Sequence, residues 1–420
     1  MPGRLLFTTV AQDLALVELA EPPLTRMIRE AGFGEGYAWP TWSPGGAQAL
    51  VSHGWRATGA ETHLEVVSLG LAGDADVLEA AEPASRFRNP DGHREPIAPG
   101  VMHYSYWAPD GRRAIVVARS TGGLTLTLLT PPSCPDGDPA GDPAAASGDW
   151  SVRGLIDGAP MFSAWSPDGT TLAAHAGQQL VLFDTSGEGG GRRVLTDQPR
   201  FRAPAWSPDG RALYYAAPGS AGPDLLWRSH PDSGAREVVT EVDGLTAVLA
   251  CPAGDDLALL TLESSGLGGR HLRVIDPADP QPRTVERGQV LGAFWSPDGT
   301  RLFYVTRAGV DLESSLMRYD VADGRKQALA RFRPSPAYST YFAFFDQYAL
   351  SHALISPDGD WVVIGGVLSG NGAGRRPFAQ QHGCYLLPAD GSAPPRRVAD
   401  GEIAFFAPGG PAPPAAEDEA

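Results

Sequence analysis

The sequence predicts an all-β protein, most simply a single β-propeller, and three observations carry this prediction. A motif of the form Trp-Ser-Pro-Asp-Gly recurs along the chain of 420 residues, which also contains 51 glycines and 39 prolines. The prolines of successive copies lie 41 to 65 residues apart. The shorter spacings match one four-stranded propeller blade, roughly 40–50 residues. Frequent Gly and Pro indicate many turns rather than long helices.

Each motif has the chemistry of a hairpin turn. The turn begins at the Ser of the motif. Proline presets φ at the second turn position, Asp suits the third, and Gly adopts a left-handed conformation at the fourth. Strand-like runs follow, for example 301–305 and 361–365. The motif tryptophans, which are expected to pack between neighbouring sheets, are Trp42, Trp107, Trp165, Trp206 and Trp295. The turn aspartates are Asp110, Asp168, Asp209, Asp298 and Asp358. Further copies begin at Ala250, Ile355 and Phe406.

The two ends of the chain complement each other. Residues 4–9, 13–19 and 25–28 are strand-like without a preceding motif, whereas 402–407 form a motif strand with no strands after it. We expect 402–407 to pair with the N-terminal strands and close the ring, which leaves no exposed sheet edge. This predicts eight four-stranded blades within 1–411, with seven as the alternative. Residues 412–420 are predicted to be a disordered acidic tail.

The repeats resemble the TolB-like propeller repeat. That repeat also occurs in the propellers of prolyl-oligopeptidase-type and tricorn-type peptidases, and a related version occurs in oligogalacturonate lyase. The resemblance covers roughly residues 1–410 and implies a propeller fold. It implies little about function, because such blades support several activities.

Composition argues against several classes of protein. The formal net charge is −16, and no basic cluster suits binding to nucleic acid or an anionic membrane. Three separate cysteines make a disulfide framework or a cysteine zinc site an unfavourable interpretation. No stretch is long and apolar enough to span a bilayer, and no secretory signal is evident. We therefore expect a cytoplasmic monomer.

The richest candidate site is the connector 331–352, which leads into a blade and contains seven aromatic residues. It is expected to lie on the upper face, opposite the motif turns, either as a plug of the central channel or as a ligand-recognition loop. Aromatic walls with a few polar groups suit a small molecule or peptide. The predicted ligand-binding residues are Arg333, Tyr338, Tyr341, Phe345, Asp346, Gln347, Tyr348, His352 and Arg202.

Histidines provide a second candidate. His352 and His103 are expected near the channel and are the candidate catalytic residues, and with His382 they are candidate metal ligands. The resemblance to oligogalacturonate lyase, which holds a metal inside its propeller, favours this interpretation. Hydrogen-bonding channel histidines, with no cofactor, are the simpler one.

The sequence favours a non-enzymatic module that binds a protein or peptide through the upper face and channel. It contains no Gly-x-Ser-x-Gly elbow, Walker motif or His-Glu-x-x-His pair. One alternative is a lyase or hydrolase that acts on a carboxylated substrate at a His-based site. Another is a small-molecule sensor.

Overall fold

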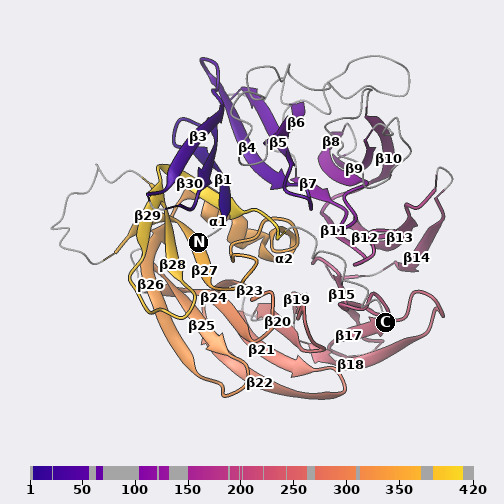
Figure 1. The fold of residues 1–420 in the computed structure, drawn as a ribbon. Coiled ribbons are helices and arrows are strands. Elements are labelled where there is room, and N and C mark those ends of the chain that lie inside the picture. The colour runs from indigo at the N-terminus through magenta and orange to yellow at the C-terminus, as the bar shows by residue number, and fades with distance from the viewer. Residues whose placement is uncertain are drawn as a thin grey trace, which may run out of the picture.

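The computed structural model is built almost wholly of β-strands, whose sheets follow one another around a central region that contains two short helices (Figure 1). It describes residues 3–409 except 56–62, 70–103, 121–122, 132–149, 188–189, 263–269, 309–312, 370–381 and residues 21, 198, 201, 221 and 243. The predicted tail 412–420 lies outside the described residues. Among the described residues, no helix is both long and apolar enough to cross a membrane.

The first sheet joins the two ends of the chain. Its strand order is β3 (Leu24–Arg29), β2 (Leu14–Glu18), β1 (Arg4–Thr9), β30 (Gly401–Phe406). Strand β30 runs antiparallel to β1, with Leu5 opposite Phe406 and Phe7 opposite Ala404. The predicted pairing of 402–407 with the N-terminal strands is therefore present.

The next sheets each consist of strands in chain order. A three-stranded sheet contains β4 (Glu35–Trp42), β5 (Gln48–Trp55) and β6 (His63–Ser68). The sheet after it contains β7 (Tyr104–Trp107), β8 (Ala114–Ser120), β9 (Gly123–Thr130) and β10 (Ser151–Asp157). The following sheet contains β11 (Met161–Trp165), β12 (Thr171–Ala176), β13 (Gln179–Asp184) and β14 (Arg192–Thr196).

The second half of the chain continues this pattern. One sheet contains β15 (Ala205–Trp206), β16 (Leu213–Pro218), β17 (Asp224–Ser229) and β18 (Arg236–Val242). Another contains β19 (Thr246–Ala250), β20 (Leu257–Leu262), β21 (Arg270–Asp276) and β22 (Asp279–Gly288). The last has seven strands: β23 (Val290–Trp295), β24 (Arg301–Ala308), β25 (Glu313–Asp320), β26 (Lys326–Pro334), β27 (Trp361–Leu368), β28 (Gly383–Pro388) and β29 (Arg396–Ala399).

The repeated motif forms the same hairpin turn at each full copy. In the copy at 165–169, the Gly169 N–H donates to the Ser166 carbonyl, and Gly169 has a φ of +72°. The Asp168 carboxylate accepts hydrogen bonds from the Thr170 backbone and from the Ser166 hydroxyl. This positive φ explains why the fourth position is glycine.

The motif tryptophans link successive sheets. Each indole N–H donates to a backbone carbonyl on the innermost strand of the preceding sheet, just before that sheet's own motif. The pairs are Trp42 with Phe405, Trp107 with Thr41, Trp165 with Tyr106, Trp206 with Ala164, and Trp295 with Leu249, at 3.1 to 3.3 Å. Each ring therefore packs between two sheets and also satisfies its one donor, as a buried Trp requires.

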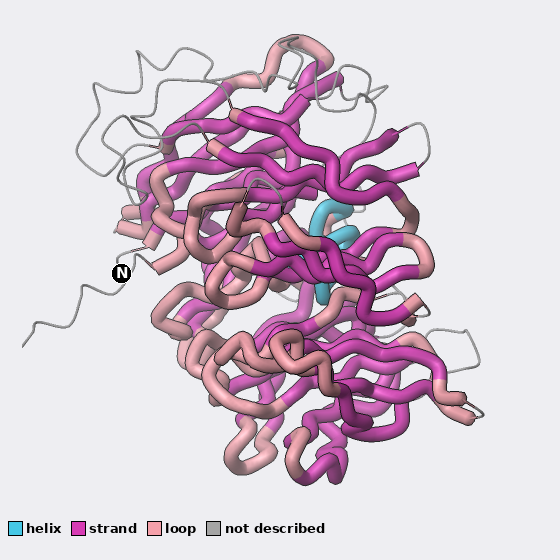
Figure 2. The backbone as a smooth tube through the Cα atoms, turned by 90° about the vertical axis from the view of Figure 1, so that its right-hand side faces the viewer, coloured by secondary structure: helices cyan, strands magenta, loops and turns pink. Residues whose placement is uncertain are grey.

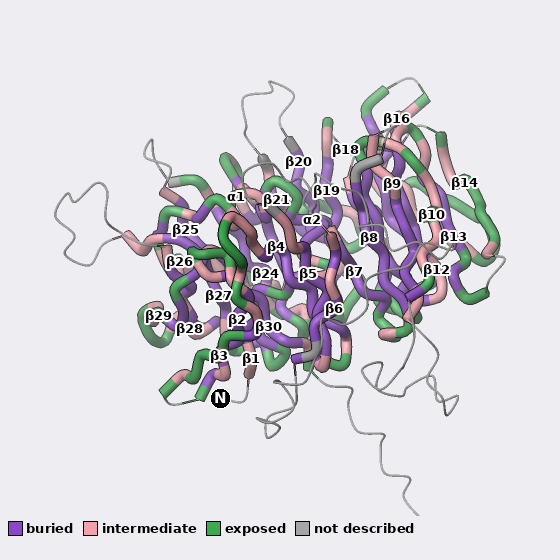
Figure 3. The backbone as a smooth tube through the Cα atoms, turned by 90° about the horizontal axis from the view of Figure 1, so that it is seen from above, coloured by how far each residue is buried: buried purple, intermediate pink, exposed green. Residues whose placement is uncertain are grey.

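Burial increases from the outer strands toward the centre. Every residue of the inner strand β11 is buried. The outer strand β14 is mostly exposed (Figure 3). The largest apolar cluster extends from the N-terminal sheet to the seven-stranded sheet and includes α1 (Pro336–Ala343) and α2 (Phe345–Tyr348). Both helices are surrounded by strands (Figure 2).

The last repeat departs from the expected pattern. His352 was expected on or near a channel strand, but it lies in a turn after α2, and only an isolated bridge between Ile355 and Val362 takes the place of an inner strand. The connector 331–352 was not expected to be helical. Ser335 caps α1 by accepting from the Tyr338 N–H, and Pro336 occupies the first helical turn, where proline is well tolerated.

Candidate functional site

The segment from Ser335 to Leu354, which we call the central segment, fills the middle of the sheet arrangement (Figure 1). Its start is fixed to two neighbouring strands. The Ser335 hydroxyl donates to the Glu402 carbonyl of β30 at 2.6 Å, and the Tyr338 hydroxyl donates to the Val363 carbonyl of β27 at 3.0 Å. These two bonds anchor the start of α1 to β30 and β27.

An ion pair attaches α2 to the residues that lead into β15. The Asp346 carboxylate accepts from Arg202 at 3.0 Å and from the Ala203 N–H at 3.0 Å. The Asp346 side chain is fully buried, and that of Arg202 is 9% exposed. A buried carboxylate requires such a partner and such hydrogen bonds, because an isolated buried charge is very costly. This interaction occupies Arg202, which was predicted to bind a ligand.

Gln347 attaches α2 to β11. Its Oε1 accepts from the Ser163 N–H at 2.7 Å, and its Nε2 donates to the Ser163 carbonyl at 2.8 Å. The same Nε2 donates to the Tyr104 hydroxyl at 2.7 Å, and that hydroxyl donates to the Gln347 carbonyl at 3.0 Å. The side-chain amide thus pairs with the free edge of β11 as a neighbouring strand would.

His352 lies in a polar contact set surrounded by aromatic rings. Its Nε2 is 3.1 Å from the Thr41 hydroxyl, and its Nδ1 is 2.6 Å from the Ser351 hydroxyl. The side chain is 1% exposed, and the rings of Tyr348 and Phe405 meet it edge-on. Burial lowers the pKa of His352 to about 3, so the ring is neutral at physiological pH.

The other aromatic residues of the central segment form its packing. Tyr338 and Tyr341 stack with ring centroids 6.0 Å apart, and Tyr341 stacks on Tyr348 at 5.6 Å. The Tyr341 hydroxyl donates to the His352 carbonyl at 3.2 Å. Phe345 is fully buried. Burial raises the pKa of Tyr338, Tyr341 and Tyr348 well above the usual value for tyrosine.

The structure brings most of the predicted ligand-binding residues together, in contacts that hold the central segment in place. Arg333 lies apart from them on β26 and is exposed. His103 lies outside the described residues. His382 is near Glu402, with its Nδ1 3.9 Å from a carboxylate oxygen. Among the described residues, neither His352 nor His382 belongs to a group of three possible metal ligands. Their predicted ligand, catalytic and metal roles stay predictions.

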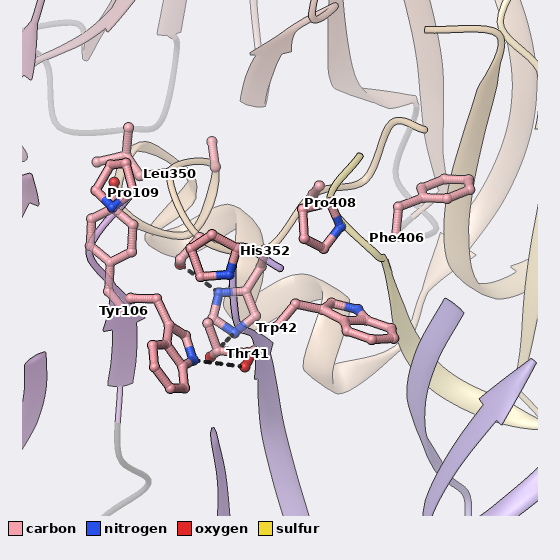
Figure 4. A pocket seen from close by; sticks show the side chains of 13 residues that line it. Thr41, Trp42, Tyr106, Pro109, Leu350, His352, Phe406 and Pro408 are labelled. Carbon is pink, nitrogen blue, oxygen red and sulfur yellow. Dashed lines mark hydrogen bonds between the residues drawn. The ribbon is translucent and has the colours of Figure 1, made fainter. Parts of the chain in front are cut away.

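A pocket of about 270 Å³ opens where the central segment reaches the side of the motif turns (Figure 4). Its walls are mainly aromatic and proline side chains, and none of its lining residues carries a formal charge. His352 contributes to its wall, as Figure 4 shows. The lining residues are Thr41, Trp42, Pro44, Tyr106, Trp107, Pro109, Ala349, Leu350, Ser351, His352, Ala353, Phe406 and Pro408.

Sequence reasoning expected the site on the opposite face, and His352 is the one predicted ligand-binding residue that lines this pocket. Pro44 and Pro109 belong to motif turns, which identifies the pocket's face as the turn face. A sequence signal for the pocket is the apolar residue Leu350, which closely follows the aromatic run. In the structure its side chain is 37% exposed. Sequence reasoning also missed a cluster of His53, His63 and Glu65 on β5 and β6. The alternate spacing of His63 and Glu65 could have indicated it, because alternate residues share one face of a strand.

Comparisons with known proteins support the fold. No family model matches the chain. An uncharacterized peptidase of Bacillus subtilis (strain 168), YuxL, is 38% identical over 86 residues, which make up 20% of this chain. The match spans only 13% of that protein's length.

Solved structures resemble the chain over most of its length. A eukaryotic initiation factor is 10% identical, with 97% of this chain and 99% of that chain covered and a TM-score of 0.53. A prolyl endopeptidase is 14% identical, with 76% and 46% covered and a TM-score of 0.50. TolB from Acinetobacter baumannii is also similar, at 14% identity, 89% and 83% coverage and a TM-score of 0.41. At such identities the likeness concerns the fold alone. The chain has the fold of a β-propeller.

Proposed function

We propose that this protein is a non-enzymatic β-propeller that binds a protein or peptide segment through the pocket on its turn face. The observation that carries the proposal is the docked central segment. Gln347 and Asp346 fix α2 to two separate sheets, so the centre is a packed core. The exposed recesses of the surface are then the places where a partner can bind. This moves the binding surface from the predicted upper face to the turn face.

The pocket's size and chemistry suggest what binds. Pockets that enclose whole small ligands usually measure roughly 300–1,000 Å³. A pocket of about 270 Å³ suits one or two side chains of a longer segment. Its Trp, Tyr, Phe and Pro walls favour an apolar side chain or a proline of the bound segment. A net charge of −16 favours basic residues on either side of it.

The surroundings of His352 do not favour an enzyme with a His-based site. Both ring nitrogens contact hydroxyl groups, and burial lowers the pKa to about 3. A general base works best with a pKa near the operating pH. Arg202, a candidate for binding a substrate carboxylate, is already paired with Asp346.

We also infer that the scaffold has eight blades. The seven-stranded sheet divides naturally between β26 and β27, where only Phe332 to Pro334 pair across the junction. With this division, the sheets described above number eight. The pairing of β30 with β1 supports closure of the ring by the two ends of the chain.

The test is a selection from a peptide phage library with the purified full chain, followed by fluorescence polarisation of the enriched peptides. Leu350→Glu places a charge in the pocket at a partly exposed position. Val194→Glu, at a position 45% exposed on β14, is the matched control. We expect enriched peptides that lose at least about tenfold affinity for Leu350→Glu only, since a buried charge is strongly disfavoured in an apolar pocket. Peptides that bind Leu350→Glu as tightly as wild type would refute the proposal.

A further inference from the structure

A cluster of histidine and glutamate side chains lies on the sheet of β4, β5 and β6, away from the pocket's lining residues. His53 on β5 is directly opposite His63 on β6, and Glu65 follows two positions later on the same face of β6. Glu35 on β4 is diagonal to His53, because Tyr37 is opposite His53. Three strands therefore bring four titratable side chains to one place. The strands β4, β5 and β6 lie near the top of Figure 1.

The distances converge on one carboxylate. The Nδ1 of His53 is 2.8 Å from Glu65 Oε1, and the Nε2 of His63 is 2.9 Å from the same oxygen. One ligand atom from each of the three residues lies within 4.8 Å of the others. In a tetrahedral zinc site with bonds of about 2.0–2.1 Å, ligand atoms are about 3.3 Å apart. The two nitrogen–oxygen distances lie within about 0.5 Å of this spacing, and the two nitrogens lie within 4.8 Å of each other.

The far nitrogen of His53 lies beside a second carboxylate. His53 Nε2 is 3.3 Å from a Glu35 carboxylate oxygen, and this contact lacks the alignment of a hydrogen bond. A histidine ligand typically directs its second ring nitrogen to a carboxylate, which fixes the tautomer and leaves the other nitrogen available for the metal. The Tyr37 ring stacks on His53 at 4.3 Å and holds the plane of the imidazole. A small rotation of the Glu35 side chain on metal binding would align this contact as a hydrogen bond, which makes Glu35 a positioning residue rather than a ligand.

Access also suits a cation. His53 and Glu65 are 15% and 20% exposed, and His63 is 38% exposed, so the cluster is preorganised but open on one side.

We propose that His53 Nδ1, His63 Nε2 and Glu65 Oε1 bind one Zn²⁺, with Glu35 orienting His53. Two imidazoles and one carboxylate are a donor set that zinc accepts, and the fourth coordination position is left to water or to an exogenous ligand. The site would join β5 to β6 and is independent of the peptide pocket.

The test uses the full chain, stripped with a chelator and dialysed, and titrated with ZnCl₂ by isothermal titration calorimetry at pH 7.5. We expect one Zn²⁺ per chain with a micromolar or lower Kd. His63→Ala should weaken binding at least about tenfold, and Glu35→Gln about tenfold or more without a change in stoichiometry. His230→Ala is the control, because His230 is 33% exposed and also lies beside a glutamate, Glu237.

A second readout separates a metal site from a network of hydrogen bonds. Co²⁺ should produce visible absorption bands in the wild type that His63→Ala lacks, with far-UV circular dichroism confirming that the variant folds. A Kd for Zn²⁺ above about 1 mM, or binding that His63→Ala leaves unchanged, would overturn the proposal. In those cases His53, His63 and Glu65 form an ion-pair network only.

Discussion

The side-chain amide of Gln347 hydrogen-bonds both backbone groups of Ser163, its Oε1 accepting at 2.7 Å and its Nε2 donating at 2.8 Å. The two residues are 184 positions apart in the sequence. One side chain thus takes the place of a paired strand at the inner edge of β11. This relationship joins the central segment to a sheet formed much earlier in the chain.

Loss of the Gln347 amide should destabilise the protein. Gln347→Ala leaves the buried N–H and carbonyl of Ser163 without their partner, and each such group costs about 1–3 kcal/mol. We expect the free energy of unfolding in urea to fall by at least about 2 kcal/mol. Gln179→Ala, which removes a contact to Arg192 at the surface, should change it by less than about 0.5 kcal/mol. Equal effects of the two substitutions would contradict the anchoring role of Gln347.

The Asp346–Arg202 pair should show strong coupling. Asp346→Ala leaves the Arg202 guanidinium buried without its counter-charge, which typically costs about 3–5 kcal/mol. The double variant Asp346→Ala/Arg202→Met should recover part of that loss, because it removes the unpaired charge. Chemical denaturation of the single and double variants measures this. At the exposed pair Arg228–Glu237, Glu237→Ala should cost less than about 1 kcal/mol.

His352 should make stability depend on pH in the acid range. Its pKa is about 3 in the folded chain against 6.5 for an unperturbed histidine, so the unfolded chain binds the proton more readily. Stability is then fully present above about pH 6.5 and falls toward pH 3, with a slope of about 1.4 kcal/mol per pH unit from this residue.

The control for this prediction is a histidine with a different environment. His352→Gln should remove the slope contributed by His352, whereas His382→Gln, at a position 31% exposed, should keep it. Tyr104 and Tyr348 face His352 but stay neutral in this range, because burial raises the pKa of each. Denaturant unfolding between pH 4 and 7 provides the measurement. An unchanged slope in His352→Gln would show that other groups control the pH dependence.

Deletion of β30 should be far more damaging than deletion of the tail. Removing 401–420 exposes the edge of β1 and removes the buried side chains of Ile403, Phe405 and Phe406. We expect a large drop in Tm, or failure to fold. Removing 412–420 should leave Tm within about 2 °C. Differential scanning calorimetry of the two truncations decides it, and similar Tm values would argue against a structural role for the pairing of the chain ends.

Much of the fold could be predicted from local patterns. Motif turns require glycine at a positive φ, as at Gly169, and the strand-like runs after them are strands. The helices α1 and α2 were missed because their start signal is short: Ser335 followed by Pro336 also suits a turn. Aromatic residues at 338–348 indicated burial but not a helical conformation.

The sequence by itself determined the repeat, the turn geometry and the strands that join the chain ends, because these depend on neighbouring residues and on alternation within a strand. Only the tertiary structure decided that Asp346 and Gln347 hold the central segment in place, that the pocket opens on the turn face, and that His53 faces His63 and Glu65. These relationships join residues from different repeats or strands. They depend on strand register and on the path of the central segment, which no local pattern specifies.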